Sequence, residues 1–428
     1  MIYTAAHLGY DPKLVPIGGG AQVALRLIRR WAETQPFSLT VLGSGPLPVT
    51  LDGIEYREIP WHVPGQPRVL TDLTVQGYAH FSRQFERGVT QFLAARVREC
   101  DPKKVCILHN DIAEAGDFAA IARLGFHQVA VFHVDVVDYA ARIYGRGLVP
   151  ASRLAGLWRG LERARLARLL PDVAQLIFRK QEACARYCDL LVVPSQGMRE
   201  VLLSAYPWRS EEDVLVVPWG AIADPPPPGA GEEVERLRIE YGLDQDTPVL
   251  LSLSRISPEK GQDLLLRALR LWERQGGGRL VALICGAPAF IHGQGYMRRL
   301  LRLAGRLKRV EVHFPGYVAG VRKAAFFRLA DLYVFPSRHE SYGLTLVEAM
   351  AAGLPVLTTP HRSAADLVRP EFGRVVEASP WGIFQGLREL LARREELSRM
   401  GKRAQAFART LSFEKAADRL AQAMAALS

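Results

Sequence analysis

The stretch LYVFPSRHESYGLTLVEAMAAGLPVLTT, residues 332–359, contains one complete strand–helix–strand unit. Its first run, LYVFPS (332–337), and its last, PVLTT (355–359), are rich in the apolar, aromatic and β-branched residues typical of strands. Between them, GLTLVEAMAA (343–352) has a helical pattern, which Gly353 ends. Two strands joined by one helix predict a parallel pair with a right-handed crossover.

The same alternation extends along the whole chain. Other short apolar runs separated by longer helical patterns are IYTAA (2–6), SLTVLG (38–43), KVCILH (104–109), QVAVFHV (128–134), LLVVPS (190–195), PVLLSLS (248–254), LVALICG (280–286) and VEVHFPG (310–316). Strands that are apolar throughout and alternate with helices indicate parallel sheets covered on both faces. The pattern restarts after residue 245, so the predicted fold class is α/β with two Rossmann-like, doubly wound domains.

A proline run separates the two predicted domains. AIADPPPPGAGEE (221–233) contains four consecutive prolines, which continue neither a helix nor a central strand. We predict an N-terminal domain over 1–222, a C-terminal domain over 223–412 and a final helix within 413–428 whose docking position stays open. A cleft between the two facing domains, at the carboxyl ends of the strands, is the expected ligand site.

Composition limits the class of protein and its partners. The 428 residues are 49% hydrophobic and 23% charged, as in soluble globular proteins. The first ten residues do not resemble a signal peptide, and five scattered cysteines indicate a reducing, cytoplasmic setting. The net charge of +11 and the pI of about 9.6 favour an acidic partner: a nucleoside diphosphate, a sugar phosphate, an anionic lipid or a nucleic acid.

Two segments supply the groups that a nucleotide-sugar site needs. The free N–H groups at the start of the helix near Gly343 suit an anion, while Glu340 and Glu348 suit pairs of sugar hydroxyls. In SRISPEKGQDLLLRAL (254–269), cations stand at the mouth of a strand-to-helix turn and suit a departing diphosphate; they are Arg255 and Lys260. The structural alternatives are a charged helix start for the carboxylates and surface ion pairs for the cations.

Residues 180–420 resemble the retaining glycosyltransferases of family four, which share the two-domain GT-B fold. The hallmark of that family is the spacing from Glu340 to Glu348 followed by EAMAAGLPV. RISPEKG matches its basic turn, and FPGYV (314–318) matches its base-binding strand end. CDLLVVPSQGMRE (188–200) and VLVVPWG (214–220) match its connecting segments.

The resemblance implies a role for each matching position. Arg255 and Lys260 would neutralise the donor diphosphate, Glu348 would bind the ribose hydroxyls and Glu340 the donor sugar. The remaining donor contacts that it implies are the backbone at Gly343, Leu344 and Thr345, and the base-bordering pair Tyr317 and Val318.

The N-terminal half matches the family less closely. His133 would contact the transferred sugar, although a histidine after a strand is also often a hydrogen-bonded interior residue. The loop at Gly19 and Gly20 would approach the diphosphate and the acceptor; a plain tight turn is the alternative. Two departures stand out: the segment 361–366, where many relatives have a Gly-Gly pair and a Glu, and Trp219, where Asn is common.

We therefore expect a hexosyltransferase that moves a sugar from a nucleoside-diphosphate-sugar to an acceptor hydroxyl with retention, in polysaccharide, glycolipid or small glycoside synthesis. In a front-face route, the departing phosphate takes the acceptor's proton. The chain shows no acidic D-x-D cluster at a donor strand end, so no metal and no cofactor are expected. Alternatives are transfer to a sugar phosphate, as in sucrose-phosphate synthase, and a GT-B-fold nucleotide-sugar isomerase. A nucleic-acid-binding protein is suggested only by the charge and lacks a stacking motif.

The acceptor is the least determined part. HNDIAEAGD (109–117) follows a strand end, and its candidate acceptor contacts are His109, Asn110 and Asp111. The basic segment 139–170, which contains Arg142, has three interpretations. It docks on an anionic membrane at the inner face, with a lipid-linked acceptor; it captures a sugar phosphate; or it is a solvated helix face.

Overall fold

The described residues of this computed structural model are 1–11, 18–47, 49, 51–65, 70, 73–143, 145, 149–221, 227–244, 246–289 and 293–427. They form two compact units: the first unit is Met1–Pro218 with Phe413–Ser428, and the second unit is Trp219–Ser412. Much of the predicted linker, residues 222–226, lies outside the described residues.

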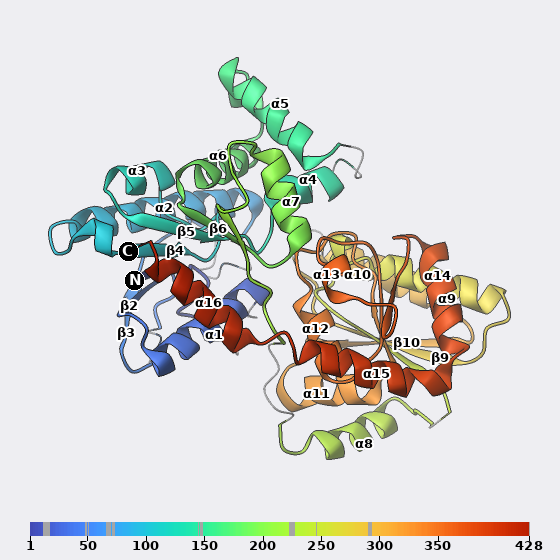
Figure 1. Cartoon of the computed structure of the whole chain (residues 1–428). Helices are drawn as coiled ribbons and strands as arrows, with labels where there is room; N and C mark the ends of the chain where they lie inside the picture. The colour runs from blue at the N-terminus through green and yellow to red at the C-terminus, as the bar shows by residue number, and fades with distance from the viewer. Residues whose placement is uncertain are drawn as a thin grey trace. The chain divides into compact units, whose positions relative to one another are not determined.

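The first unit contains, within its described residues, a parallel sheet of seven strands in the order β3-β2-β1-β4-β5-β6-β7 (Figure 1). The strands are β1 (Ile2–Thr4), β2 (Leu39–Gly43), β3 (Ile54–Glu58), β4 (Cys106–His109), β5 (His127–Val131), β6 (Leu190–Val193) and β7 (Val214–Val216). Because β1 lies between β2 and β4, the chain builds one half of the sheet from β1 and then returns to build the other half from β4. The strand order therefore reverses between β1 and β4, and the carboxyl ends of these two strands form a topological switch point.

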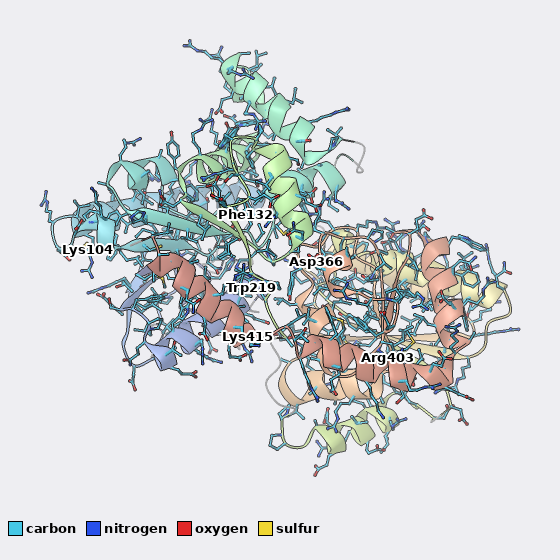
Figure 2. The ribbon with its side chains drawn as sticks, in the orientation of Figure 1. Lys104, Phe132, Trp219, Asp366, Arg403 and Lys415 are labelled. Atoms are coloured by element: carbon cyan, nitrogen blue, oxygen red, sulfur yellow. The ribbon has the colours of Figure 1, made fainter. Side chains whose placement is uncertain are left out.

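The helices of the first unit are α1 (Gly19–Thr34), α2 (Val75–Arg96), α3 (Phe118–Arg123), α4 (Val136–Ile143), α5 (Ala151–Arg163), α6 (Asp172–Tyr187), α7 (Gln196–Ala205) and α16 (Phe413–Ala425), with short 3-10 turns at Pro102–Lys104 and Ala167–Leu169. Phe132, labelled in Figure 2, directly follows β5 and is fully buried. It belongs to a core cluster that joins the strands β5 and β6 to the helices around them.

The final helix packs on the first helix. The guanidinium of Arg30 in α1 donates to both carboxylate oxygens of Asp418 in α16, at 3.0 and 2.8 Å. The indole N–H of Trp31 donates to the carbonyl oxygen of Ala417 at 3.3 Å, and Leu420 is fully buried. These contacts give the docking position that the sequence left open.

The second unit contains, within its described residues, a parallel sheet of six strands in the order β10-β9-β8-β11-β12-β13. The strands are β8 (Val249–Leu253), β9 (Leu280–Cys285), β10 (Val310–Gly316), β11 (Leu332–Phe335), β12 (Val356–Thr358) and β13 (Gly373–Val375). The helices are α8 (Ala230–Glu240), α9 (Gln262–Arg274), α10 (Gly293–Ala304), α11 (Gly320–Leu329), α12 (Leu344–Ala351), α13 (Ala364–Leu367), α14 (Pro380–Leu391) and α15 (Arg394–Ala408), with a 3-10 turn at Pro258–Lys260.

The predicted fold class of two parallel-sheet α/β units is confirmed. The predicted strands each coincide with an observed one, but three observed strands, β3, β7 and β13, were not predicted. All three are edge strands, and each is only partly buried. The sequences of β3 and β13 lack the continuous apolar run that marks a central strand, whereas β7 is apolar and lies in a segment that the sequence analysis assigned only as a connection. Within the described part of the chain, no helix is both long and apolar enough to cross a membrane.

Candidate functional site

The turn after β8 and the segment after β11 touch at one edge of the second sheet. β8 and β11 are neighbouring parallel strands, so their carboxyl ends lie together. Gly261 has a φ of 68°, and a Cβ there would lie 2.0 Å from the carbonyl oxygen of Pro336. The backbone N–H of Arg338 donates to the carbonyl oxygen of Glu259 at 2.7 Å. Glycine is therefore required where the two segments meet.

The side chain of Arg338 fastens this junction. Its guanidinium donates to the carbonyl oxygen of Pro258 at 2.8 Å and to the two carboxylate oxygens of Asp263 at 2.7 and 3.0 Å. The hydroxyl of Tyr296 also donates to Asp263, at 2.7 Å, and Arg299 lies 3.4 Å away. Burial opposes ionisation of Asp263, but these partners outweigh it and hold the pKa of its carboxyl below the usual range.

Lys260 and Glu340 form a mostly buried ion pair at the junction. The Lys260 ammonium contacts the Oε2 atom of Glu340, and the side chains are 12% and 16% exposed. The ammonium also lies 5.8 Å from the ring centre of Phe335. Burial opposes ionisation of Glu340, but the charge of Lys260, helped by His361 and His339, lowers its pKa to about 2. Glu340 is therefore a pure hydrogen-bond acceptor at neutral pH.

The start of α12 lies beside this ion pair. Gly343 is its N-cap residue with a φ of 86°, and a Cβ on Gly343 would lie 3.6 Å from Cγ of Glu340. The first N–H groups that donate back into the helix belong to Leu346 and Val347, which both bond the carbonyl of Gly343. The N–H groups that precede them, at positions 344–345, lie in the first turn of the helix, where backbone donors and the helix dipole favour an anion.

Glu348, one turn further along α12, carries a second lysine partner. Its carboxylate oxygens lie 2.8 and 2.7 Å from the Lys323 ammonium of α11, and only 4% of the Glu348 side chain is exposed.

The two predicted base contacts lie between β10 and α11. Tyr317 is 56% exposed, and Val318 is buried. Thr345 contacts the hydroxyl of Tyr333 at 2.8 Å. Sequence reasoning missed Lys323, because it belongs to no motif.

The two predicted cations occupy different positions on one turn. Lys260 is held against Glu340, whereas Arg255 is 45% exposed and its guanidinium lies 4.0 Å from a carboxylate oxygen of Glu259. The structure thus brings Lys260, Glu340 and the start of α12 together. It places Arg255 at the open side of the same turn.

The segment that departs from the family pattern is tied to the α12 loop. His361 is buried, and its two ring nitrogens lie 3.1 Å from the hydroxyls of Thr358 and Ser363. The Ser363 hydroxyl in turn donates to the carbonyl oxygen of Tyr342. Asp366, labelled in Figure 2, belongs to the short helix α13 that follows. Side-chain hydrogen bonds therefore support this loop. Trp219, the other departure, is almost fully buried.

In the first unit, Asn110 connects several predicted residues. Its Oδ1 atom accepts a hydrogen bond from the Tyr3 hydroxyl at 2.6 Å and from Nε2 of His133 at 3.1 Å, and its Nδ2 lies 3.5 Å from the carbonyl oxygen of Gly20. A Cβ on Gly20 would lie 3.0 Å from the His133 ring. Burial, with a contribution from His7, lowers the pKa of His133 to about 4, so the ring is neutral at pH 7. Gly19, next to Gly20, is the first residue of α1.

The other predicted acceptor residues are more dispersed. His109 is fully buried, with ring nitrogens 3.1 Å from Thr4 and 3.3 Å from Gln128, and burial lowers its pKa to about 3. The ring of His109 thus lies in the interior of the first unit. Asp111 caps its own turn at the N–H of residue 113. Arg142 lies 3.7 Å from the carboxylate of Asp138 within α4.

A histidine–carboxylate pair beside these residues escaped sequence reasoning. Nε2 of His7, in the loop after β1, lies 2.9 Å from Oε1 of Glu114, in the loop after β4. The Tyr78 hydroxyl donates to the same oxygen at 2.7 Å. The pattern HNDIAEAGD had marked the loop of Glu114, but no local signal connected it with a histidine more than a hundred positions earlier.

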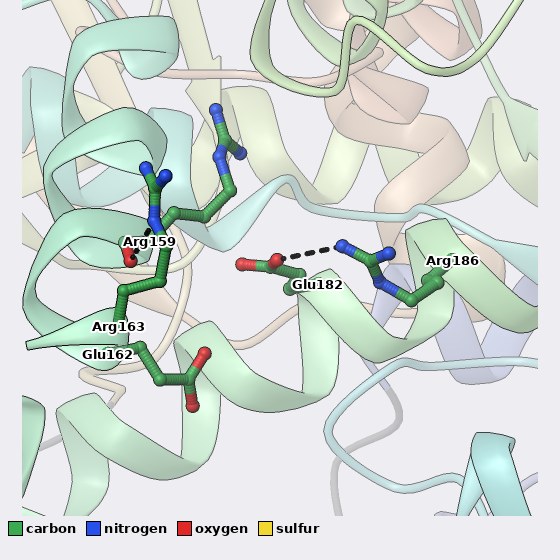
Figure 3. Close-up of a pocket in the computed structure, with 5 residues that line it drawn as sticks. All are labelled: Arg159, Glu162, Arg163, Glu182 and Arg186. Carbon is green, nitrogen blue, oxygen red and sulfur yellow. Dashed lines mark hydrogen bonds and ion pairs between the residues drawn. The ribbon is translucent and has the colours of Figure 1, made fainter. Parts of the chain in front are cut away.

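A hollow of about 510 Å³ lies between α5, which belongs to the predicted basic segment 139–170, and α6 of the first unit (Figure 3). The residues that line it are Arg159, Glu162, Arg163, Glu182 and Arg186. Figure 3 shows the ion pair of Glu182 with Arg186, which lie one turn apart on α6. Among the described residues, no group of three or more His, Cys, Asp or Glu side chains is placed to hold a metal ion.

The second unit matches a known family. Residues 233–407 match the family model described as glycosyl transferases group 1. The D-inositol 3-phosphate glycosyltransferase of Corynebacterium glutamicum is 30% identical over 239 residues, which cover 54% of this chain and 56% of that protein. The chain thus spans about half the length of the curated relatives it matches.

Solved structures are similar over nearly the whole chain. Sucrose-phosphate synthase from Thermosynechococcus elongatus has a TM-score of 0.69 at 18% identity, with 98% of this chain and 97% of that one covered. Anabaena HepE in complex with UDP and glucose has a TM-score of 0.65 at 18% identity, with 99% and 98% covered. These similarities show the fold, and the GT-B assignment made from the sequence is confirmed.

Loss of the Arg338 side chain tests the junction. We expect Arg338→Met to lower the free energy of unfolding by about 3 kcal/mol in urea titrations, because it removes the main counter-charge of the buried Asp263. The matched control is Arg279→Met, whose partners Asp244 and Glu311 lie on the surface of the same unit, and it should leave stability nearly unchanged. Equal losses of unfolding free energy in the two variants would contradict the stabilising role of Arg338 at this junction.

The pKa of Glu340 predicts a pH dependence. Its folded pKa of about 2 lies below the unfolded value of 4.5, so the stabilisation by the ion pair is complete above pH 4.5 and disappears as the pH falls toward 2. Over that interval the loss is about 3 kcal/mol, since one pKa unit equals about 1.4 kcal/mol. Unfolding free energies of the wild type and the double variant Lys260→Met/Glu340→Gln should therefore converge as the pH falls. A constant difference between pH 5 and pH 2.5 would refute this assignment.

Proposed function

We propose, on the premise that residues 233–407 belong to the glycosyl transferases group 1 family, that this chain transfers a sugar from a nucleoside-diphosphate-sugar to an acceptor hydroxyl with retention of configuration. The observation that carries the proposal is the contact of Lys260 with Glu340 beside the start of α12. It combines a cation and helix N–H groups for a diphosphate with an ionised carboxylate for sugar hydroxyls.

Lys260 can serve both partners at once. An ammonium group has three donors, so it can keep its contact with Glu340 and donate another hydrogen bond to a phosphate oxygen. The Arg338 junction fixes the turn that carries Lys260 relative to the Glu340 segment. The charge that develops on a departing diphosphate then meets donors already in place, which is the condition for electrostatic catalysis. Arg255, at the open side of the turn, contributes a second positive charge.

In this proposal, the carboxylates of Glu340 and Glu348 bind different parts of the donor. Glu340, beside the helix start, accepts hydrogen bonds from the transferred sugar. Glu348, further inside α12, accepts those of the ribose, and its ion pair with Lys323 holds its carboxylate in place. Tyr317 and Val318 border the base. The family resemblance supports this order of binding along the site.

In the reaction, the bond between the anomeric carbon and the diphosphate oxygen breaks, and the acceptor oxygen forms a bond on the same face. The departing phosphate oxygen takes the acceptor's proton, so no protein base is needed. Lys260, Arg255 and the α12 N–H groups stabilise the negative charge left on the diphosphate. The residues assigned here work without a metal ion or another cofactor.

The relatives suggest where to look for substrates. HepE is described in complex with UDP and glucose, and two similar proteins are named for inositol phosphate and sucrose phosphate chemistry. We therefore include transfer to a hydroxyl of a phosphorylated polyol or sugar in the proposal. A cytoplasmic location also belongs to it; all five cysteines are free thiols in the structure.

Two variants test the donor site separately. Lys260→Ala should lower turnover by about two to three orders of magnitude, as loss of one preorganised charge stabiliser does. Glu348→Ala should mainly weaken donor binding, seen as a smaller thermal shift in a panel of UDP, GDP and ADP sugars. The controls are the exposed residues Lys308→Ala and Glu371→Ala of the same unit. Near-normal turnover of Lys260→Ala, or a panel in which no nucleotide sugar binds, would refute the proposal.

We also propose that the second half of α5 and the segment directly after it contact an anionic membrane. Leu157, Leu166 and Leu169 are 60%, 48% and 76% exposed, and the arginines at 163, 165 and 168 beside them are exposed too. Apolar side chains next to cations are the combination that binds anionic lipid surfaces. The protein should sediment with vesicles that contain phosphatidylglycerol, and Leu157→Ser/Leu169→Ser should reduce this several-fold. Equal sedimentation of both proteins, or none with the wild type, would exclude membrane contact.

A further inference from the structure

The α6 wall of the hollow in Figure 3 lies toward the amino edge of the first sheet. Its residues Glu182 and Arg186 belong to the last turns of α6, which ends at Tyr187 just before β6 begins. The backbone N–H of Asp189 donates to the carbonyl oxygen of Gln128, near the start of β5, at 2.8 Å. Substrates of open parallel sheets bind at the opposite, carboxyl edge. The hollow is therefore separate from the position expected for an acceptor.

Both helices around the hollow are held in place. Trp158 of α5 is 3% exposed and stacks on Phe178 of α6, with their ring centres 5.1 Å apart. The guanidinium of Arg159 donates to the carbonyl oxygen of Ala205, at the end of α7, at 3.0 Å. The volume of about 510 Å³ is within the range of small-molecule sites. The hollow thus has fixed walls and enough room for a small ligand.

Two arginines of the hollow, from different helices, meet at one tryptophan. The guanidinium carbons of Arg159 and Arg186 lie 5.3 and 4.9 Å from the ring centre of Trp208. The indole N–H of Trp208 donates to the carbonyl oxygen of Ala185 at 3.1 Å, which fixes the ring. Arg163 follows Arg159 one turn further along α5. Guanidinium groups gathered in this way repel one another, and their planar forks match the oxygens of a phosphate, which would remove the repulsion.

Positive charge exceeds negative charge in the hollow. One of its two carboxylates, that of Glu162, is paired with a further arginine, Arg179 of α6, at 3.2 Å. Glu182 is then the carboxylate that remains to balance the three lining arginines. The excess positive charge favours an anionic ligand.

The carboxylate of Glu182 lacks a hydrogen-bond donor on one side. Its Oε1 atom lies 3.5 Å from Nη2 of Arg186, whereas Oε2 is buried and has no hydrogen-bond partner in the part of the chain that the structure describes. Figure 3 shows this carboxylate between Arg186 and the arginines of α5. Burial raises the pKa of Glu182 although Arg159 and Arg186 oppose it, as expected for a carboxylate with too few donors. Because buried polar atoms are normally paired, a ligand hydroxyl would supply the missing donor.

We infer that the hollow is a second ligand site, for a phosphorylated polyol or sugar whose phosphate binds the three lining arginines and of which one hydroxyl donates to Oε2 of Glu182. The inference goes beyond the proposed sugar transfer, because none of the residues assigned to the donor takes part. Two sources carry this chemistry: a free sugar phosphate, and the headgroup of an inositol lipid at the membrane surface proposed for α5.

Calorimetry with the full chain and no nucleotide sugar tests the phosphate contacts. The probes are D-inositol 3-phosphate, myo-inositol and inorganic phosphate, and the wild type should bind the first most tightly. Arg163→Ala should weaken binding of D-inositol 3-phosphate and of inorganic phosphate by about 10-fold, as expected for one lost charge-assisted hydrogen bond. The control is Arg153→Ala, which removes an exposed arginine of the same helix and should change both affinities by less than about twofold.

Glu182→Gln tests the hydroxyl contact. Arg186 requires an acceptor, so the amide oxygen faces it and the amide nitrogen, which cannot accept, takes the place of Oε2. The variant loses a negative charge and should bind inorganic phosphate at least as tightly as the wild type. Its preference for D-inositol 3-phosphate over inorganic phosphate should nevertheless fall by about 10-fold.

Sedimentation with phosphatidylcholine vesicles, with and without phosphatidylinositol, identifies the source of the ligand. Extra sedimentation with phosphatidylinositol that Glu182→Gln loses would assign a lipid headgroup, and binding of the soluble probe alone would assign a free sugar phosphate. The inference is overturned if the wild type binds neither D-inositol 3-phosphate nor these vesicles. Equal losses in Arg153→Ala and Arg163→Ala, or an unchanged preference in Glu182→Gln, would also overturn it. None of these outcomes bears on the donor site.

Discussion

The proposed donor site depends on the close approach of two backbone segments of the second unit at Gly261 and Pro336. Without a side chain at 261, the turn after β8 touches the segment after β11, and the carbonyl of Glu259 receives the N–H of Arg338. The Arg338 guanidinium then joins Pro258 and Asp263 across the junction. Because that contact is fixed, Lys260 and Glu340, which are eighty positions apart in the sequence, keep a constant position relative to each other. The ion pair of Lys260 and Glu340 is a consequence of it.

Buried carboxylates of this protein stay ionised because charged or hydrogen-bonding partners oppose the effect of burial. Glu340 and Asp263 stay ionised although burial favours their neutral forms, because a lysine and an arginine stand against them. In the first unit, Glu114 follows the same rule with His7 and Tyr78. His133 shows the opposite result: burial, with a contribution from His7, lowers the pKa of its ring and keeps it neutral. Each unit therefore presents ionised acceptors in fixed positions at the carboxyl edge of its sheet.

The central strands and the donor motif could be predicted because both are local patterns: a continuous apolar run, or a glycine and two glutamates on one helix start. The edge strands β3 and β13 could not, since charged residues interrupt their short, partly buried sequences and leave no apolar run to detect. The burial of His109 could not be predicted either, because a polar residue at a strand end can turn inward, as His109 does here toward Gln128. Lys323 and His7 were missed because their carboxylate partners lie in other elements, and pairings that distant have no local sequence signal.

The most direct test of the central claim is a crystal structure of the chain with the nucleoside diphosphate that stabilises it best in thermal shifts. The account predicts that the diphosphate contacts the Lys260 ammonium and the N–H groups at positions 344–345, with the ribose hydroxyls on Glu348. A diphosphate bound elsewhere, with Lys260 still engaged only by Glu340, would contradict the account.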